Sequence, residues 1–393
     1  MFDARAGAWA DATAVLVDDG VIVGLSQSAP DGWQVLEVPG ASLLPGLIDA
    51  HTHVLLRSSY NELELARQMV EENFGYRAAC AVQAMSIAVT HGFTTIRDLG
   101  TEGAGYLDVG LRDAARQGVV PGPRMLVAGP AIRSTGRYPL PGERHSLTFP
   151  VGIDSCTGPD ACRETVRTQI AHGIDCLKIY VSEGFEAPSG AADYPDGPLV
   201  WTDEEVNAFV DEAHRQGVKV AAHSLTLSGA RMAVAAGVDS IDHGFGISPD
   251  LAADMAARGT ALVPTLLVTR EHEAHGSMIS EPVRAAHNRS FVNCLAAGVR
   301  IVFGTDVGGF EWTRVHQAEE FSLMTALGMP AADALQAGTL RAAELLGLGG
   351  TAGLLEPGAA ADIVAVAGDP LQDIESLQRT ELVIQAGRVA WKA

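Results

Sequence analysis

Two histidines separated by one residue, His51 and His53, carry the strongest chemical signal in this 393-residue sequence. They directly follow an apolar run, residues 43–48, that predicts a buried strand. Side chains alternate between the two faces of a strand, so both imidazoles project to the same side. Two neutral imidazoles at one strand end supply half of a transition-metal site. A pair this short also occurs in ordinary polar turns, so the metal interpretation depends on further ligands elsewhere in the sequence.

Polar residues also lie on four other predicted strands. They are Lys178 within 176–180, and His223, His243 and Asp306 at strand ends. Because the active sites of β/α barrels lie at the carboxyl ends of the strands, we expect these side chains to converge on one rim. A single histidine at a strand end is usually structural, but this joint occurrence favours a metal site. Lys178 is unusual, since a cationic amine is costly to bury and cannot bind a metal; either it is modified into an anion or it pairs with Asp306.

Eight short apolar or β-branched segments alternate with amphipathic stretches that predict helices. The predicted strands are residues 44–49, 93–98, 125–129, 176–181, 218–223, 240–243, 261–266 and 300–306. One intervening helix is predicted to begin after Thr202, an N-cap with Glu205 three residues later, and to stop at Gly217. The alternation predicts an α/β protein with a (β/α)₈ TIM barrel, a fold of roughly 250 residues. The alternative is a doubly wound open sheet, but no Gly-x-Gly-x-x-Gly loop follows a strand.

The two ends of the chain differ from its centre, because they contain β-rich pieces and turn signals. Neither end can bury a core alone, so we expect residues 1–44 and 354–393 to form one small β-sandwich beside a catalytic barrel of residues 45–353. Three segments that follow predicted strands are long enough to be functional loops over the site. These segments are residues 130–158, 182–201 and 267–283.

Composition excludes several classes of protein. The net charge of −21 disfavours non-specific binding to nucleic acid or to anionic membranes. The five cysteines form no Cys-x-x-Cys pair, which indicates reduced thiols. No apolar run approaches the roughly 20 residues of a membrane helix, and the N-terminus lacks a secretory signal. We therefore expect a cytoplasmic protein with a small-molecule substrate; a homo-oligomer is left open.

The combined pattern resembles the metal-dependent amidohydrolase superfamily, and within it the binuclear imidazolonepropionase-like and prolidase-like branch. The resemblance covers essentially the whole chain. It rests on His51-x-His53, Lys178, His223, His243 and Asp306, on Pro45-Gly46-Leu47-Ile48-Asp49, and on Gly353, Pro357-Gly358 and Ala361-Asp362. True imidazolonepropionases usually use one metal and lack the bridging lysine, so Lys178 argues against that subclass.

The resemblance implies two divalent metal ions and a carboxylated lysine. Lys178 would be carboxylated by CO₂ and bridge the two metals. His51, His53 and Asp306 would hold the more buried metal, and His223 and His243 the more exposed one. Zinc is the first choice, while cobalt, manganese and iron also suit these ligands.

A hydroxide shared by two such metals is a nucleophile at neutral pH, and Asp306 would orient it and carry its proton to the leaving nitrogen. We therefore expect a hydrolase that cleaves an amide-type C–N bond in a dipeptide or an N-acyl amino acid. The alternative is hydrolysis of a non-peptide molecule: a carbamate, cyclic amide, lactone or phosphotriester. A remote alternative is an inactive barrel that only binds a ligand. No Gly-x-Ser-x-Gly elbow supports a serine nucleophile.

The sequence indicates the substrate-binding residues less clearly than the metal ligands. Peptidase relatives often carry a Thr-Gly-Gly-His segment after strand three, and His145 could take the place of that histidine on a longer loop. Some relatives have a tyrosine two residues after the strand-five histidine; Leu225 stands there, and Tyr180 could replace the hydroxyl. Asp49 and Asp98 are candidates to fix imidazole tautomers.

The remaining candidates fall into three groups. Rim arginines that could bind a substrate carboxylate are Arg137, Arg144, Arg270 and Arg314. Weak candidates for substrate contacts are His272, His275 and His316. Histidines that we interpret as structural, in or near predicted helices, are His91, His172, His214 and His287.

Overall fold

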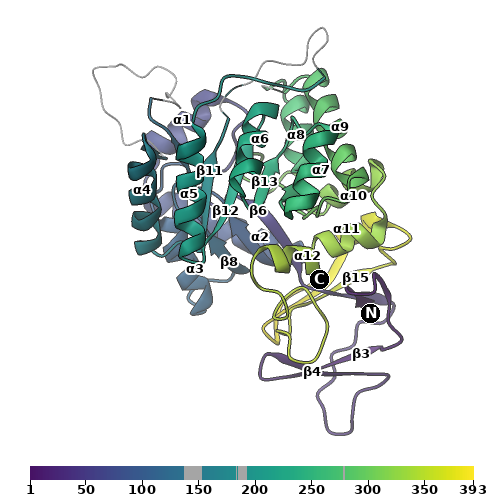
Figure 1. Cartoon of the computed structure of the whole chain (residues 1–393). Helices are drawn as coiled ribbons and strands as arrows, with labels where there is room; N and C mark the ends of the chain where they lie inside the picture. Colours follow the sequence, from purple (N-terminus) through teal and green to yellow (C-terminus); the bar gives the residue numbers. More distant parts are fainter. Residues whose placement is uncertain (137–152, 183, 185–192, 278) are drawn as a thin grey trace.

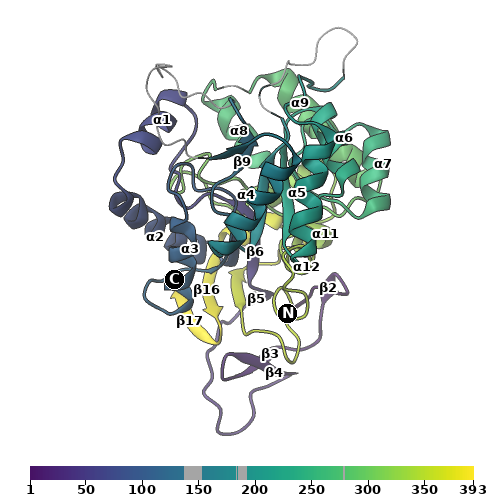
Figure 2. The same ribbon diagram turned by 60° about the vertical axis from the view of Figure 1, so that its left-hand side comes forward.

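The computed structural model describes residues 1–136, 153–182, 184, 193–277 and 279–393. Two parallel sheets form its centre, and Figures 1 and 2 show the helices packed around them, with the terminal strands gathered on one side. Within the described ranges no helix is long and apolar enough to cross a membrane.

The first parallel sheet carries the start of the predicted barrel. Its strands are β6 (Leu47–Thr52), β7 (Phe93–Asp98) and β8 (Arg124–Val127), paired in that order. The predicted strand 44–49 is divided at Gly46, where a Cβ atom would lie 2.1 Å from Thr94 Oγ1, so only glycine fits. The chain before Gly46 therefore belongs to a terminal sheet and the chain after it to the barrel sheet.

The second parallel sheet has the strand order β10-β9-β11-β12-β13-β14. Its strands are β9 (Ile132–Ser134), β10 (Asp154–Cys156), β11 (Cys176–Tyr180), β12 (Lys219–Ser224), β13 (Ser240–His243) and β14 (Ala261–Val263). Strands β9 and β10 lie inside the segment 130–158 that the sequence predicts as a loop. Residues 137–152 of that segment, and most of the predicted loop 182–201, lie outside the described residues.

The predicted eighth strand, residues 300–306, is not a regular strand, but it makes strand-like contacts on both sides. The amide of Val302 donates to Leu262 O at 2.9 Å beside β14. On the other side the amide of Asp306 donates to His51 O at 2.8 Å in β6. These contacts join the two sheets into a TIM-barrel-like α/β fold; complete closure of the barrel stays a prediction.

Twelve α-helices lie in the described part of the chain. They are α1 (Glu62–Val70), α2 (Phe74–Thr90), α3 (Leu107–Arg116), α4 (Pro159–Ala171), α5 (Asp203–Arg215), α6 (Leu227–Ala236), α7 (Pro249–Arg258), α8 (Leu266–Ala274), α9 (Glu281–Ala296), α10 (Glu319–Ala326), α11 (Ala331–Ala337) and α12 (Leu340–Leu345). Helix α5 begins as predicted, since Thr202 Oγ1 accepts from the Glu205 amide and Glu205 Oε2 accepts from the Thr202 amide.

Helix α8 corrects the prediction that residues 267–283 form a loop. Its first amides, Leu266 N and Leu267 N, donate to the two carboxylate oxygens of Glu320 at 2.9 and 2.6 Å. A carboxylate at a helix N-terminus satisfies free N–H groups and suits the helix dipole. Because this cap lies more than fifty residues away along the chain, no local pattern predicts it.

The terminal segments form two small antiparallel sheets and one short ladder. The larger sheet has the order β17-β16-β15-β5, so both chain ends contribute to it. The strands are β1 (Phe2–Asp3), β2 (Ala8–Trp9), β3 (Ala14–Asp18), β4 (Val21–Ser26), β5 (Ala41–Pro45), β15 (Ile363–Ala367), β16 (Thr380–Gln385) and β17 (Arg388–Lys392). The packing of these sheets as a sandwich, and the domain boundaries, stay predictions.

Candidate metal centre

The strand ends bring four predicted histidines together. His51 lies in β6 and His53 one residue beyond it, while His223 and His243 come from β12 and β13. Ring centroids are 5.4 Å apart for His51 and His53, and 5.0 Å for His51 and His243. The His223 and His243 rings are separated by 4.6 Å. The imidazoles therefore form one continuous cluster, as the convergence argument predicts.

Asp306 completes a three-residue group with metal-ligand geometry. Ligand atoms of His51, His53 and Asp306 all lie within 4.8 Å of one another. The Asp306 Oδ1 atom is 3.2 Å from His53 Nε2 and 3.6 Å from His51 Nε2. Both histidines are buried. Two imidazoles and a carboxylate facing one point can hold a divalent transition metal.

The tautomer of His53 shows that this point requires a cation. His53 Nδ1 lies 3.0 Å from Gly100 O, and a carbonyl can only accept, so Nδ1 carries the proton. The lone pair of Nε2 then faces the Asp306 carboxylate. Two acceptors in contact repel unless a proton or a metal lies between them. Without a metal a proton does so: burial alone would lower the pKa of His53, but the hydrogen bond and charge of Asp306 raise it to about 9.

Backbone strain is concentrated at this site. His243, Thr265 and Asp306 have positive φ values of 66°, 50° and 59°, and Glu102 nearby has 42°. These are four of the six non-glycine residues with positive φ in the described ranges. Each such conformation costs on the order of 1–3 kcal/mol and persists only where the surroundings require it. Thr265 Oγ1 is 2.7 Å from His243 Nδ1, so the strained pair fixes the orientation of that imidazole.

Lys178 is buried, but its partner differs from the predicted one. Its Nζ atom contacts Asp242 Oδ2 rather than Asp306. Arg97 Nη2 lies 3.5 Å from the other Asp242 oxygen. Strand alternation would place Asp242 and His243 on opposite faces. The positive φ of His243 breaks that alternation, so both side chains reach His51.

Asp49 and Asp98, the predicted partners of the imidazoles, instead accept hydrogen bonds from backbone amides and from a threonine hydroxyl. Asp49 accepts from Thr305 Oγ1 at 2.6 Å, and Asp98 Oδ1 accepts from the Val54 amide at 2.7 Å. Among the described contacts neither carboxylate bonds to an imidazole ring. The groups that orient the rings are Gly100 O and Thr265 Oγ1, a carbonyl and a hydroxyl that their sequence surroundings do not single out.

A cavity of about 200 Å³ opens onto the histidine cluster. Apolar side chains form one part of its lining, namely Leu56, Leu65, Leu225, Phe245, Val268 and Ile279. Glu102, Arg133 and Tyr180 form a polar part. The Tyr180 hydroxyl donates to Glu102 Oε1 at 3.2 Å, and its ring lies 4.4 Å from that of His223. Tyr180 therefore lies at the site, whereas His145 falls outside the described residues.

The other predicted rim residues divide between the cavity and the surface. Arg270 pairs with Glu271 and Glu319, and Arg314 with Glu271, and neither lines the cavity. Arg137 and Arg144 lie outside the described residues. His272 lines the cavity, with Nε2 3.2 Å from Gly309 O. The rings of His275 and His316 instead stack on Tyr60 and His91.

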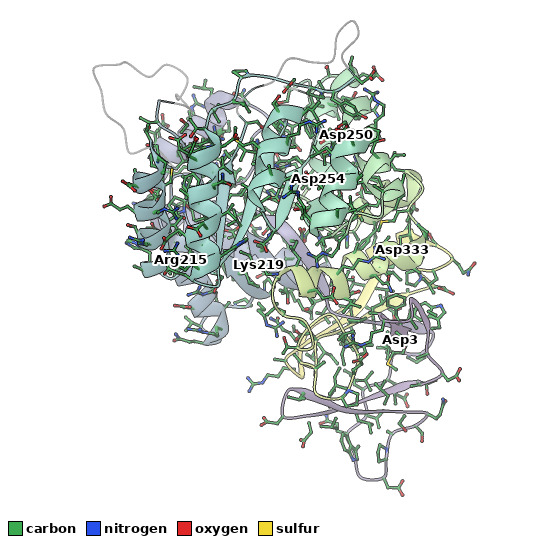
Figure 3. All side chains as sticks on the ribbon, in the orientation of Figure 1. Asp3, Arg215, Lys219, Asp250, Asp254 and Asp333 are labelled. Carbon is green, nitrogen blue, oxygen red and sulfur yellow. The ribbon has the colours of Figure 1, made fainter. Side chains whose placement is uncertain are left out.

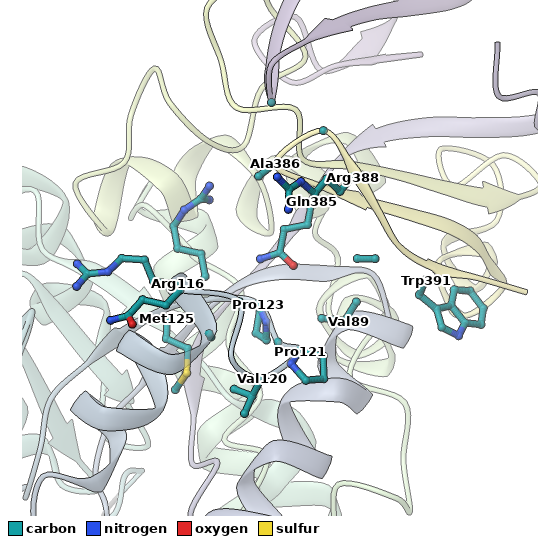
Figure 4. A pocket seen from close by; sticks show the side chains of 18 of the residues that line it. Val89, Arg116, Val120, Pro121, Pro123, Met125, Gln385, Ala386, Arg388 and Trp391 are labelled. Atoms are coloured by element: carbon teal, nitrogen blue, oxygen red, sulfur yellow. The ribbon is translucent and has the colours of Figure 1, made fainter. Parts of the chain in front are cut away.

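A second and larger cavity, of about 1460 Å³, lies between the α2–α3–β8 region and the terminal strands (Figure 4). Its lining includes Arg116, Met125, Gln385 and Arg388. None of the predicted metal ligands lines it, so the chemistry belongs to the smaller cavity.

A TIM-barrel-like fold with a His-His-Asp cluster at its strand ends defines a class of metal-site enzymes. The Amidohydrolase family model matches residues 42–390, and the chain belongs to that family. Ochratoxinase of Aspergillus niger is 26% identical over 370 residues, covering 87% of this chain and 73% of that protein. The chain is accordingly a hydrolase that acts on C–N bonds.

Two solved structures are similar over nearly the whole chain. A Xaa-Pro dipeptidase with bound methionine in its active site has a TM-score of 0.82 and 30% identity, covering 96% of this chain and 94% of that one. A prolidase complexed with N-methylphosphonate-L-proline has a TM-score of 0.83 and 28% identity, with the same coverage of both chains.

A substitution at Gly308 tests the close approach of the backbone there to His53. A Cβ atom there would lie 2.3 Å from His53 O, and the φ of Gly308 is 105°. We expect Gly308→Ala to displace His53, to lower the free energy of unfolding by about 2–4 kcal/mol and to weaken zinc binding. Gly276→Ala is the control, since its φ is also positive but no atom lies within 4 Å. Urea unfolding and zinc titration measure both effects; equal losses in the two variants would contradict the close approach.

The metal-free protein is expected to lose stability between pH 6.5 and 9 through His53. Its folded pKa of about 9 exceeds the unfolded value of 6.5, so its contribution is complete below pH 6.5 and disappears through pH 9. The loss is roughly 3 kcal/mol at most. Urea unfolding across this range should show a slope that His53→Asn and zinc loading each reduce. His214→Asn, at a half-exposed histidine, should keep it; an unchanged slope in His53→Asn would refute the assignment.

Proposed function

We propose that this protein is a binuclear metal-dependent amidohydrolase that cleaves the amide bond of an N-acyl amino acid or a dipeptide. The observation that carries the proposal is the convergence of His51, His53 and Asp306 on one point where two acceptors face each other. This arrangement fits a cation at that position.

His51, His53 and Asp306 would hold the more buried metal, and His223 and His243 the second. Lys178, once carboxylated, would bridge the two. Zinc suits these ligands, and cobalt, manganese and iron are alternatives. When bound, the metals would supply an activated water and polarise the scissile carbonyl.

The protein side chains supply positioning and proton transfer. Asp306 lines the cavity and would take the proton of the attacking water and deliver it to the leaving nitrogen. Gly100 O fixes the tautomer of His53, and Thr265 Oγ1 holds the His243 ring in its orientation. Tyr180, and His145 from the segment outside the described residues, would contact the substrate.

Two features support an amino-acid derivative as substrate. The apolar lining residues suit an apolar side chain, although Leu225, where some relatives carry a tyrosine, argues against a simple transfer of dipeptidase specificity. The similar dipeptidase and prolidase structures hold methionine and a proline phosphonate. Both ligands are amino acids or derivatives of them.

The deciding experiment is a hydrolysis screen of zinc- and cobalt-loaded protein against N-acetyl amino acids, Xaa-Pro dipeptides and other dipeptides. Amine release that stops after chelation and returns with metal supports the proposal. Metal binding without turnover of any compound would reject the amide substrate and direct the search to carbamates, lactones and phosphotriesters.

A further inference from the structure

Arg133 gives the catalytic cavity a basic group that the metal chemistry does not use. Among the described residues that line this cavity, it is the one arginine or lysine. It lies in β9, just after strand β8, and is only 9% exposed. A guanidinium this far from solvent is costly to bury unless other groups compensate its charge. The sequence offered four other arginines for anion binding, and the two that the structure describes pair with glutamates outside the cavity.

Arg133 lines the same cavity as the predicted histidine ligands and packs against Tyr180. Its Cζ atom lies 4.0 Å from the centroid of the Tyr180 ring. The same ring lies 4.4 Å from that of His223, measured between centroids. The Tyr180 hydroxyl donates a hydrogen bond to Glu102, which holds in place the ring against which the guanidinium packs. The guanidinium of Arg133 and the imidazole of His223, a predicted ligand of the second metal, therefore lie against the same tyrosine ring.

This arrangement suits an amide substrate in which the amine released by hydrolysis bears a carboxylate. In an N-acyl amino acid the carboxylate carbon is three bonds from the scissile carbonyl carbon, which places it within about 4 Å. A substrate whose scissile carbonyl lies at the His223 side of the cavity would therefore have its carboxylate near Arg133. A guanidinium binds a carboxylate through two parallel hydrogen bonds. The apolar lining residues, with Leu225 and Phe245 among them, remain for the amino-acid side chain.

We propose that Arg133 is the specificity-determining residue that binds the free carboxylate of an apolar amino-acid substrate. This assignment rests on the proposed amide hydrolysis, but it concerns recognition and is separable from turnover. It predicts that the protein discriminates strongly between a free acid and the corresponding primary amide. It also predicts that this discrimination is lost when the guanidinium is removed.

The test uses a pair of ligands that cannot be hydrolysed, N-methanesulfonyl-L-methionine and its primary amide. Calorimetry on zinc-loaded wild-type protein should give about 10- to 100-fold tighter binding of the acid, as expected for losing a charged hydrogen-bonded pair. Arg133→Met keeps the apolar stem against Tyr180 and should bind both ligands equally. Arg133→Lys should retain part of the preference, and Arg270→Met, outside the cavity, should retain all of it.

Equal binding of acid and amide to wild-type protein would overturn the proposal, as would a preference that survives in Arg133→Met or a failure of both ligands to bind. The wild-type comparison decides the matter even if Arg133→Met does not fold. Because neither ligand is turned over, a preference for the acid would stand even if the hydrolysis screen were silent, and the failure of one proposal is thereby distinguishable from that of the other.

Discussion

Asp306→Asn is expected to lower kcat for the best substrate by at least about 10³-fold. Asparagine has nearly the same shape as aspartate, but its amide carries no negative charge and cannot take the proton of an attacking water. In the metal-free protein the carboxylate is already ionised: although burial alone would raise the pKa of Asp306, the hydrogen bond and charge of His53 lower it below its usual value. The group is therefore ionised at neutral pH and faces the cavity.

The measurement is kcat together with metal content, because Asp306 is also a proposed ligand. Asp250→Asn is the matched control: Asp250 lies on the outer side of α7, exposed and paired with Arg231 (Figure 3). The control should keep full activity. Asp306→Asn should remain inactive when saturated with zinc. Recovery of the rate at high zinc would reduce Asp306 to a ligand without a role in proton transfer, and an unchanged rate would refute the mechanism altogether.

Sequence reasoning succeeded where a residue's position followed from regular geometry. His51 and His53 lie together because side chains alternate along a strand, and His243 and Asp306 join them because parallel strands end at one rim. The same holds for helix α5, whose start depends on a cap between Thr202 and Glu205, residues close in sequence. In each case the determinant is local or is a property of the whole fold.

The sequence does not predict a residue's position where that position depends on irregular backbone or on a contact with a distant part of the chain. His243 has left-handed backbone, so its side chain reaches the site beside that of Asp242, which is the partner of Lys178. Helix α8 depends on the carboxylate of Glu320 from another part of the chain. Arg133 lies in the segment 130–158 that the sequence predicts as a functional loop, but no local pattern distinguishes it there from Arg137 and Arg144, the arginines that were predicted to bind an anion. Its contact with Tyr180 is a signal that only the three-dimensional arrangement supplies.

Lys178→Arg is expected to abolish activity, with kcat/KM at least about 10³-fold lower and one metal ion bound in place of two. Burial lowers the pKa of Lys178, although the charge of Asp242 opposes this. A lowered pKa increases the fraction of neutral amine, the form that reacts with CO₂ to give an anionic ligand. Arginine can keep the ion pair with Asp242 but stays a cation at neutral pH and cannot be carboxylated.

This substitution separates the two explanations of why a lysine is buried here. If Lys178 only neutralises Asp242, Lys178→Arg should fold, bind the same metals and retain activity. If it becomes a bridging ligand, the variant should fold with similar thermal stability but lose the second metal and the activity. Lys178→Ala gives an independent readout, since added short carboxylic acids should occupy the space and restore part of the rate. Absence of such rescue, combined with an active Lys178→Arg, would leave the lysine a purely electrostatic partner of Asp242.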